Sequence, residues 1–296
     1  MAAAHSFEDP HDFLAIEDLE LASRGIVEGI WQGLRRSPFR GSGVEFESHR
    51  DYRFGDDPRH LDTSVYARTR RLCVKDYRAE TNLPLYMMLD CSGSMDVSNG
   101  SSEKWAYAAR CAAALGRLAI NAQDAAGLSL LGNEVVDHRS PRTGRTHFQN
   151  LLGMLGQAKP SGGGSLASAI REVSGFCRRK GVVVVFSDFF DHPAETVSAL
   201  TRLAAARHDV IAFQVLDPYE LELPGDGDLE IEDAETGKIL RLSAADVRAA
   251  HADAVVKWRD DFAARCRAVG IQHFSVTTNQ PIAGSLVEFL QGRTVQ

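Results

Sequence analysis

The sequence predicts an α/β protein with a mostly parallel, Rossmann-like sheet that carries helices on both faces. From residue 84 onward, short apolar runs alternate with longer segments of helical periodicity, as expected of repeated strand–helix units. Residues 181–186 contain an unbroken run of four β-branched valines, which is typical of a parallel strand covered on both sides. A carboxylate follows two of the predicted strands, at Asp90 and Asp188. Ligands of such sheets bind at the carboxyl ends of the strands, so these positions mark the expected site.

Length and composition exclude several classes of protein. The chain has 296 residues, a net charge of -7 and a hydrophobic content of 44%, which suits one large soluble domain with an appendage. The net negative charge argues against nonspecific nucleic-acid binding. No apolar run reaches the roughly 18 residues of a membrane span, and the amino terminus lacks the pattern of a signal peptide. The five scattered cysteines favour reduced thiols, so we expect a cytoplasmic protein.

The first 82 residues are expected to form a separate region, before a main domain over 83–296. Apolar residues recur at near-helical spacing over 11–36, which predicts a helix. Segment 43–54 alternates in polarity and is expected to be extended, and segment 70–78 is expected to be a second extended piece.

The elements of the main domain are predicted from the alternation of strand-like and helix-like segments after residue 84. A strand over 85–89 precedes a helix over 103–122, and a strand over 126–131 is expected to pair with 133–139 as a hairpin. The remaining predictions follow the same alternation: helices 146–157 and 165–180, strand 181–186, helix 195–207, strand 210–216, helix 243–269, strand 271–277 and helix 283–291. Two clusters of turn residues interrupt it over 218–242, so we expect a β-hairpin insertion there.

A metal site is predicted where three loops of the main domain converge. The first loop offers Asp90, Ser92 and Ser94, the second offers the hydroxyl of Ser165 after three glycines, and the third offers Asp188. Carboxylate and hydroxyl oxygens are hard ligands that suit Mg²⁺, with Mn²⁺ or Ca²⁺ as alternatives. Two carboxylates only neutralise a divalent ion, so the ion would stay attractive to a carboxylate from a partner.

The residues of the first loop also suit two different roles. Asp90, Ser92 and Ser94 could form a turn whose hydroxyls cap a helix. A Mg²⁺-dependent phosphohydrolase with Asp90 as a phosphoaspartyl nucleophile is a second alternative, although such enzymes place another Asp where this chain has Ser92. The glycine-rich loop lacks the lysine of a nucleotide-binding loop, and no Ser lies in a nucleophile elbow. We therefore expect a protein that is not an enzyme.

The three loops resemble the metal-ion-dependent adhesion site of von Willebrand factor A domains. The likeness rests on D-x-S-G-S at 90–94, the Gly-Gly-x-Ser loop before a helix, and Ser-Asp after the central strand. The family usually has Thr where this chain has Ser165, and Gly where it has Phe189. The resemblance implies the von Willebrand factor A fold and a docking function in which a partner's Glu or Asp completes the metal shell.

Segments before the main domain resemble a narrower bacterial family, catalogued as domain of unknown function number fifty-eight. The matching stretches are 45–52, 55–62, 67–68 and 74–75, and later 217–220 and 233–237. The chain departs at Thr63, where a Trp is common, and it lacks the membrane-spanning segments of many relatives. Since this family is often encoded beside MoxR-type AAA+ ATPases, the resemblance implies such an ATPase or its client as partner, and a role in protein maturation or remodelling.

Overall fold

The structure is a computed structural model that describes the greater part of the chain. It describes residues 19–24, 26–27, 49–51, 73–75, 83–96, 103–223, 227–232 and 239–294. The chain forms two compact units, one of residues 38–82 and one that joins residues 1–37 to 83–296.

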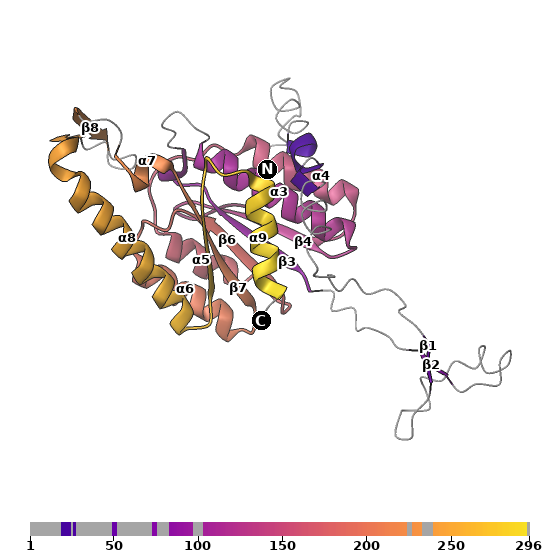
Figure 1. Cartoon of the computed structure of the whole chain (residues 1–296). Coiled ribbons are helices and arrows are strands. Elements are labelled where there is room, and N and C mark those ends of the chain that lie inside the picture. The colour runs from indigo at the N-terminus through magenta and orange to yellow at the C-terminus, as the bar shows by residue number, and fades with distance from the viewer. Residues whose placement is uncertain are drawn as a thin grey trace. The chain divides into compact units, whose positions relative to one another are not determined.

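The main unit is built on one six-stranded sheet (Figure 1) with the strand order β10-β7-β6-β3-β4-β5. Its strands are β3 (Leu85–Asp90), β4 (Ala126–Leu131), β5 (Val135–Arg142), β6 (Val182–Ser187), β7 (Asp209–Leu216) and β10 (Gln272–Thr277). All neighbouring pairs are parallel except β4 and β5. The predicted mostly parallel α/β sheet is therefore confirmed, including the antiparallel partner of β4.

The order of the strands creates a switch point between β3 and β6. From β3 the chain moves outward to β4 and β5, then crosses back to β6 and continues outward through β7 and β10. The connections therefore leave β3 and β6 in opposite directions, which opens a crevice at their carboxyl ends. Leu89 pairs with Phe186 in this register, so Asp90 and Asp188 follow at the same edge of the sheet.

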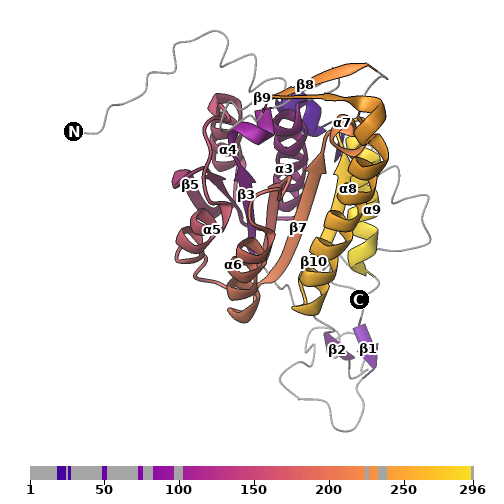
Figure 2. The same cartoon turned by 90° about the vertical axis from the view of Figure 1, so that its left-hand side faces the viewer.

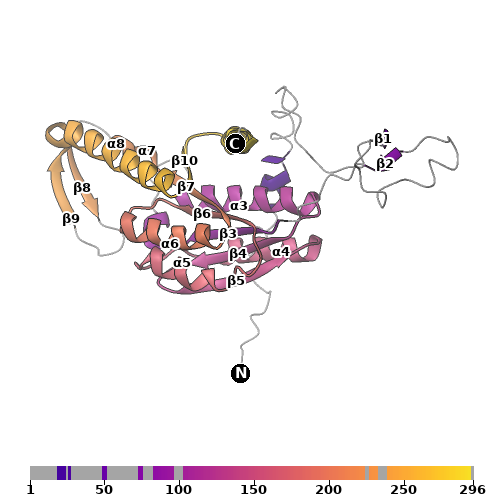
Figure 3. The same cartoon turned by 90° about the horizontal axis from the view of Figure 1, so that it is seen from below.

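Helices cover both faces of the sheet, and Figure 3 shows the strands between α3 and the pair α5 and α6. One face packs against α3 (Lys104–Asn121), α4 (Arg145–Gln157) and α9 (Ile282–Thr294). The other face packs against α5 (Leu166–Ser174), α6 (Pro193–Ala205) and α8 (Ala244–Ala268). Side chains alternate between the two cores because successive strand residues point to opposite faces: Met87 and Leu89 enter the first core, Tyr86 and Met88 the second.

Two predicted elements differ from the observed ones. The helix predicted over 165–180 ends at Ser174, because the amides of Phe176 and Cys177 bond to carbonyls three residues back and tighten the chain out of the helix. The insertion predicted over 218–242 begins with a one-turn helix, α7 (Pro218–Leu221), that Asp217 caps.

The hairpin itself pairs β8 (Asp228–Glu232) with β9 (Ile239–Ser243), antiparallel and directly before α8. Figure 2 shows this hairpin at one end of the long helix α8. No helix of the described part of the chain is long and apolar enough to cross a membrane.

The N-terminal helix predicted over 11–36 is seen at residues 19–24 and 26–27, and its remainder lies outside the described residues. This helix attaches to the main unit, since Gln149 donates to Glu20 at 2.7 Å and Arg117 donates to Ser23 at 3.2 Å. Val27 is buried in the first core.

The smaller unit contains one antiparallel pair, β1 (His49–Asp51) and β2 (Cys73–Lys75). The pair agrees with the extended structure predicted for segments 43–54 and 70–78. The other residues of those segments lie outside the described part of the chain.

Candidate metal site

Two buried carboxylates lie at the switch point of the sheet. Asp90 is the last residue of β3 and is 6% exposed, and Asp188 directly follows β6 and is 2% exposed. The hydroxyl of Ser187 donates to Oδ2 of Asp90 at 2.6 Å and so joins the two strand ends. The convergence predicted from the sequence is present for these two residues.

The first loop folds back on the carboxylate that precedes it. The amide of Ser92 donates to Oδ1 of Asp90 at 3.0 Å, which closes a tight turn. Residues Gly93–Asp96 continue as a single 3₁₀ turn, and the hydroxyl oxygens of Ser92 and Ser94 lie 3.1 Å apart. The spacing of two residues therefore brings both hydroxyls into one small area beside Asp90.

Backbone hydrogen bonds attach the glycine loop to the first loop. The amide of Gly93 donates to the carbonyl of Gly162 at 2.7 Å, and the amide of Ser161 donates to the carbonyl of Cys91 at 3.0 Å. Ser165 is the N-cap of α5, and its Oγ accepts from the amide of Ser168 at 3.3 Å. Ser165 therefore acts as a helix cap, and its oxygen retains a second lone pair.

A glycine is required in this loop for close packing. A Cβ at Gly164 would lie 2.1 Å from Oδ1 and 2.6 Å from Cα of Asn133, which follows β4. Only glycine permits this approach. This close contact positions Ser165, the next residue, at the start of α5.

Lys104, the first residue of α3, is a buried charge beside the candidate site that the sequence patterns did not reveal. Its Nζ donates to Oδ2 of Asp188 at 2.7 Å and also to Oε1 of Glu220, while the lysine is fully buried. Its ammonium also lies 5.5 Å from the ring centroid of Phe190. A signal was available, since Lys104 shares the helical face of Ala108 and Cys111, both of which are buried.

Glu220 connects this lysine to the insertion. One carboxylate oxygen accepts from the amide of Asp217 at 2.8 Å and completes the capping box of α7, and the other pairs with Lys104. Burial raises the pKa of Glu220, although the charge of Lys104 opposes the rise. Burial alone would lower the pKa of Lys104, but the charges of Asp188 and Glu220 outweigh it, so the pKa is raised and the lysine is charged.

The electrostatics of the site favour an added cation. Burial, and next the negative charge of Asp188, raise the pKa of Asp90 to about 6, although hydrogen bonds from Ser187 and Ser92 oppose the rise. A divalent cation beside both carboxylates would relieve that repulsion. The thiol of Cys91 lies next to this site with its pKa raised by burial to about 11, so it is protonated at neutral pH and is a poor nucleophile.

The oxygen ligands of the candidate site suit a hard divalent ion such as Mg²⁺. Within the described ranges, no group of three or more His, Cys, Asp or Glu side chains could hold a metal. The candidate site instead offers two carboxylates, with the neighbouring hydroxyls of Ser92 and Ser94 and the hydroxyl of Ser165 on the attached loop. Mg²⁺ accepts such a set because it prefers oxygen ligands and keeps some of its water. Lys104 already neutralises part of Asp188 and would compete with the ion.

Comparison with known proteins places the chain in a family. Residues 48–261 match the family described as "Protein of unknown function DUF58". The chain is 33% identical to the uncharacterized protein Rv1480 of Mycobacterium tuberculosis (strain ATCC 25618 / H37Rv) over 291 residues, which covers 97% of this chain and 91% of that protein. The chain therefore belongs to the DUF58 family, which confirms the resemblance seen in the sequence.

Solved structures give the fold class. The conserved hypothetical protein BatB from Bacteroides thetaiotaomicron aligns with a TM-score of 0.50 and 16% identity, over 72% of this chain and all of that one. The von Willebrand factor A domain of SpRpn10 aligns at a TM-score of 0.44 and 12% identity, over 69% of this chain and 93% of that one. The sheet itself, with its parallel strands, one antiparallel edge strand and helices on both faces, agrees with the von Willebrand factor A type of fold that the sequence resemblance implied.

Proposed function

We propose that this protein is a metal-dependent protein-interaction module, in which Asp90, Ser92, Ser94, Ser165 and Asp188 hold Mg²⁺ directly or through water. The observation that carries the proposal is the meeting of Asp90 and Asp188 at the switch point of the sheet, with two hydroxyls folded against Asp90. Lys104 balances the charge of Asp188, but the buried carboxylate of Asp90 has no ion-pair partner among the described residues, so an added cation would balance it.

The ligand types explain why such a site would dock a partner. Asp90 and Asp188 together balance the charge of a divalent ion, and the serine hydroxyls are neutral. The bound ion therefore supplies an electrophilic position for a Glu or Asp carboxylate from the partner. The three serines would orient that position, because a local hydrogen bond holds each of them within its own segment.

Lys104 would set the metal affinity of the site. In the described geometry its ammonium already balances Asp188, so a divalent ion competes with an internal cation for the same carboxylate. Such competition lowers the metal affinity of the chain alone. A partner carboxylate would then raise the affinity, since it adds a ligand that the chain lacks. Docking and metal binding are therefore expected to strengthen each other.

The partner is proposed by family resemblance to be a MoxR-type AAA+ ATPase or its client, with a role in protein maturation or remodelling. We place the protein in the cytoplasm, where the four described cysteines, all free and buried, would stay reduced. The phosphoaspartyl alternative gains no support from the geometry, because Asp90 is held by Ser187 and Ser92 on both of its oxygens.

The proposal is tested in two steps with the full chain. Isothermal titration of Mg²⁺ and Mn²⁺ into chelator-treated protein should show one saturable site. Asp90→Ala should remove this site, whereas Asp137→Ala, at a half-buried aspartate of β5, should leave it unchanged. A purified MoxR-type ATPase from the same organism should then bind in Mg²⁺ and dissociate in chelator. Equal metal binding by wild type and Asp90→Ala would overturn the metal site, and partner binding that persists in chelator would overturn the docking mechanism.

A further inference from the structure

A second polar pocket lies in the main unit, between α7, α8 and the end of β10. Its volume is about 500 Å³. His273, Ser275 and Thr277 alternate along β10 and so present the same face of the strand to the pocket, while α8 supplies Arg259 and Asp260. The residues of the candidate metal site do not line it.

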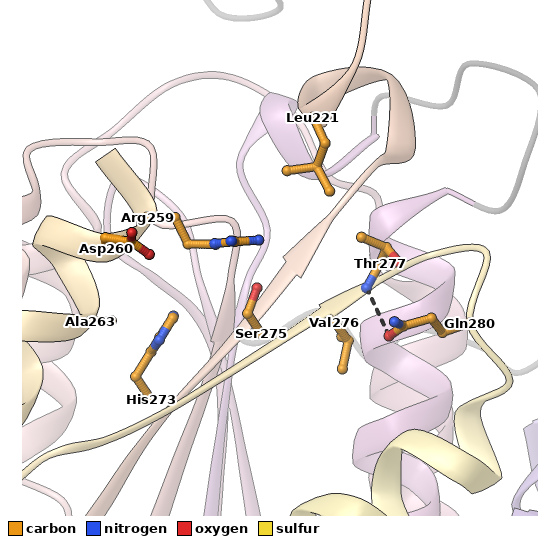
Figure 4. Close-up of a pocket in the computed structure, with 9 residues that line it drawn as sticks. All are labelled: Leu221, Arg259, Asp260, Ala263, His273, Ser275, Val276, Thr277 and Gln280. Atoms are coloured by element: carbon orange, nitrogen blue, oxygen red, sulfur yellow. Dashed lines mark hydrogen bonds between the residues drawn. The ribbon is translucent and has the colours of Figure 1, made fainter. Parts of the chain in front are cut away.

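Arg259 gives this pocket its charge. Its side chain reaches from α8 across the pocket above Ser275 and beside His273 (Figure 4). The guanidinium, which is partly buried, has no hydrogen-bond acceptor or ion-pair partner among the described residues. Arg265 on the same helix differs, since it pairs with Asp261 at 2.7 Å. A charged fork of donors without an acceptor is suited to an anionic ligand.

The neighbouring hydrogen bonds fix the chemistry of His273. The side-chain amide of Gln214 donates to the backbone carbonyl of Asp188 at 3.0 Å, so its oxygen faces His273 and accepts from Nε2 at 3.1 Å. Burial, then the charges of Arg259 and Arg267, lower the pKa of His273 to about 4. The ring is therefore neutral at pH 7, with its proton on Nε2 and an acceptor at Nδ1.

We propose that this pocket binds a carboxylate group through the guanidinium of Arg259 and the hydroxyl of Ser275. The carboxylate belongs either to a small free acid or to an acidic side chain of a docked protein. The site does not depend on the metal, so it stands whether or not the proposed function is correct.

The charges of the pocket favour a carboxylate over a phosphate. Among the described residues that line the pocket, Arg259 is the one with a positive charge, and the exposed Asp260 also lines it. A singly charged carboxylate matches one guanidinium, whereas a phosphate dianion would meet Asp260 with a surplus negative charge. Neutral His273 adds an acceptor and no positive charge.

The test is a titration of the full chain, isotopically labelled, with sodium acetate at constant ionic strength. The readouts are the imidazole resonances and the pKa of His273. Acetate should shift them saturably, with a dissociation constant of about 1–10 mM. Bound acetate should also raise the pKa of His273, because it offsets the charge of Arg259. Arg259→Gln should weaken binding at least about tenfold, whereas Arg265→Gln should leave it unchanged.

Further arms identify the source and class of the ligand. A capped tripeptide with a central Glu that binds at least about tenfold more tightly than acetate supports a protein side chain, and equal or weaker binding supports a small acid. The Asp90→Ala variant in chelator should bind acetate as the wild type does, which separates this site from the metal proposal. Absence of a saturable shift, equal binding by Arg259→Gln, or preference for phosphate by more than about tenfold would overturn the proposal.

Discussion

The ammonium of Lys104 donates to Oδ2 of Asp188 at 2.7 Å, although 84 positions of sequence separate the two residues. Both side chains are almost completely buried. This contact gives the metal-free protein a counter-charge of its own at the point where a divalent ion is proposed to bind. The lysine and the ion therefore compete, and substitution of the lysine should affect stability and metal affinity in opposite directions.

Lys104→Met should destabilise the metal-free protein by about 3–5 kcal/mol, because it leaves Asp188 and Glu220 buried without their cation. The same variant should bind Mg²⁺ at least about fivefold more tightly, since the competitor is gone. Urea unfolding with and without Mg²⁺ measures the first effect, and calorimetric titration measures the second.

Glu220→Gln is the matched control for that experiment. It keeps the contact of Lys104 with Asp188, so metal affinity should change far less than in Lys104→Met. Weaker Mg²⁺ binding by Lys104→Met than by the wild type would show that the lysine supports the site instead of competing with the ion.

The pH dependence of stability should report the burial of the Asp90 carboxylate and its repulsion by Asp188. Its pKa is raised from 3.8 to about 6 in the folded state, so its contribution to stability is complete below about pH 4 and is lost as the pH rises through about 6. The shift corresponds to about 3 kcal/mol at neutral pH. Thermal unfolding in chelator should show this loss between pH 4 and 7.

Saturating Mg²⁺ should reverse the loss above pH 6, and Asp90→Asn should remove the dependence in both conditions. A metal-free protein whose stability stays constant from pH 4 to 7 would contradict the raised pKa of Asp90 that burial and the charge of Asp188 produce.

Gly164→Ala should weaken Mg²⁺ binding and destabilise the fold by about 1–3 kcal/mol, because the new Cβ collides with the backbone of Asn133 and displaces Ser165. Gly284→Ala provides a contrasting case within α9, where a Cβ meets no atom within 4 Å. It should stabilise the protein by about 0.5–1 kcal/mol through helix propensity. Unfolding curves and Mg²⁺ titrations of the two variants measure these effects. Unchanged stability and Mg²⁺ affinity in Gly164→Ala would contradict the prediction.

Ser94→Ala should lower Mg²⁺ affinity by about tenfold while leaving metal-free stability within about 1 kcal/mol, since the half-buried hydroxyl bonds only to Ser92 among described residues. Ser140→Ala, on the exposed surface of β5, is the control and should leave the metal affinity unchanged. An unaltered affinity in Ser94→Ala would remove this hydroxyl from the ligand set.

Most of the fold could be predicted because local patterns and topology agree. The β-branched run of β6, the turn after Asp90 and the glycines before Ser165 each carry their own local signal. Since parallel strands end at one edge of a sheet, sequence order alone was enough to bring Asp90 and Asp188 together. The residues that failed prediction depend on long-range contacts: Lys104 meets Glu220 across 116 positions, and His273 meets Gln214 across 59. No periodicity in a single segment encodes such pairs.

Glu220 both completes the capping box of α7 and pairs with Lys104, which limits how much of the insertion can be deleted. The hairpin β8–β9 looks like a removable decoration, yet the helix turn in front of it supplies a charge to the interior of the main unit. A variant in which the insertion is deleted from the residue after Leu221 keeps the charge of Glu220. A variant in which it is deleted from the residue after Leu216 loses Glu220, so Lys104 keeps one carboxylate partner of its two. Some relatives are expected to have an insertion of a different length. In these we expect the length to change after the first helical turn and that turn to keep an acidic residue.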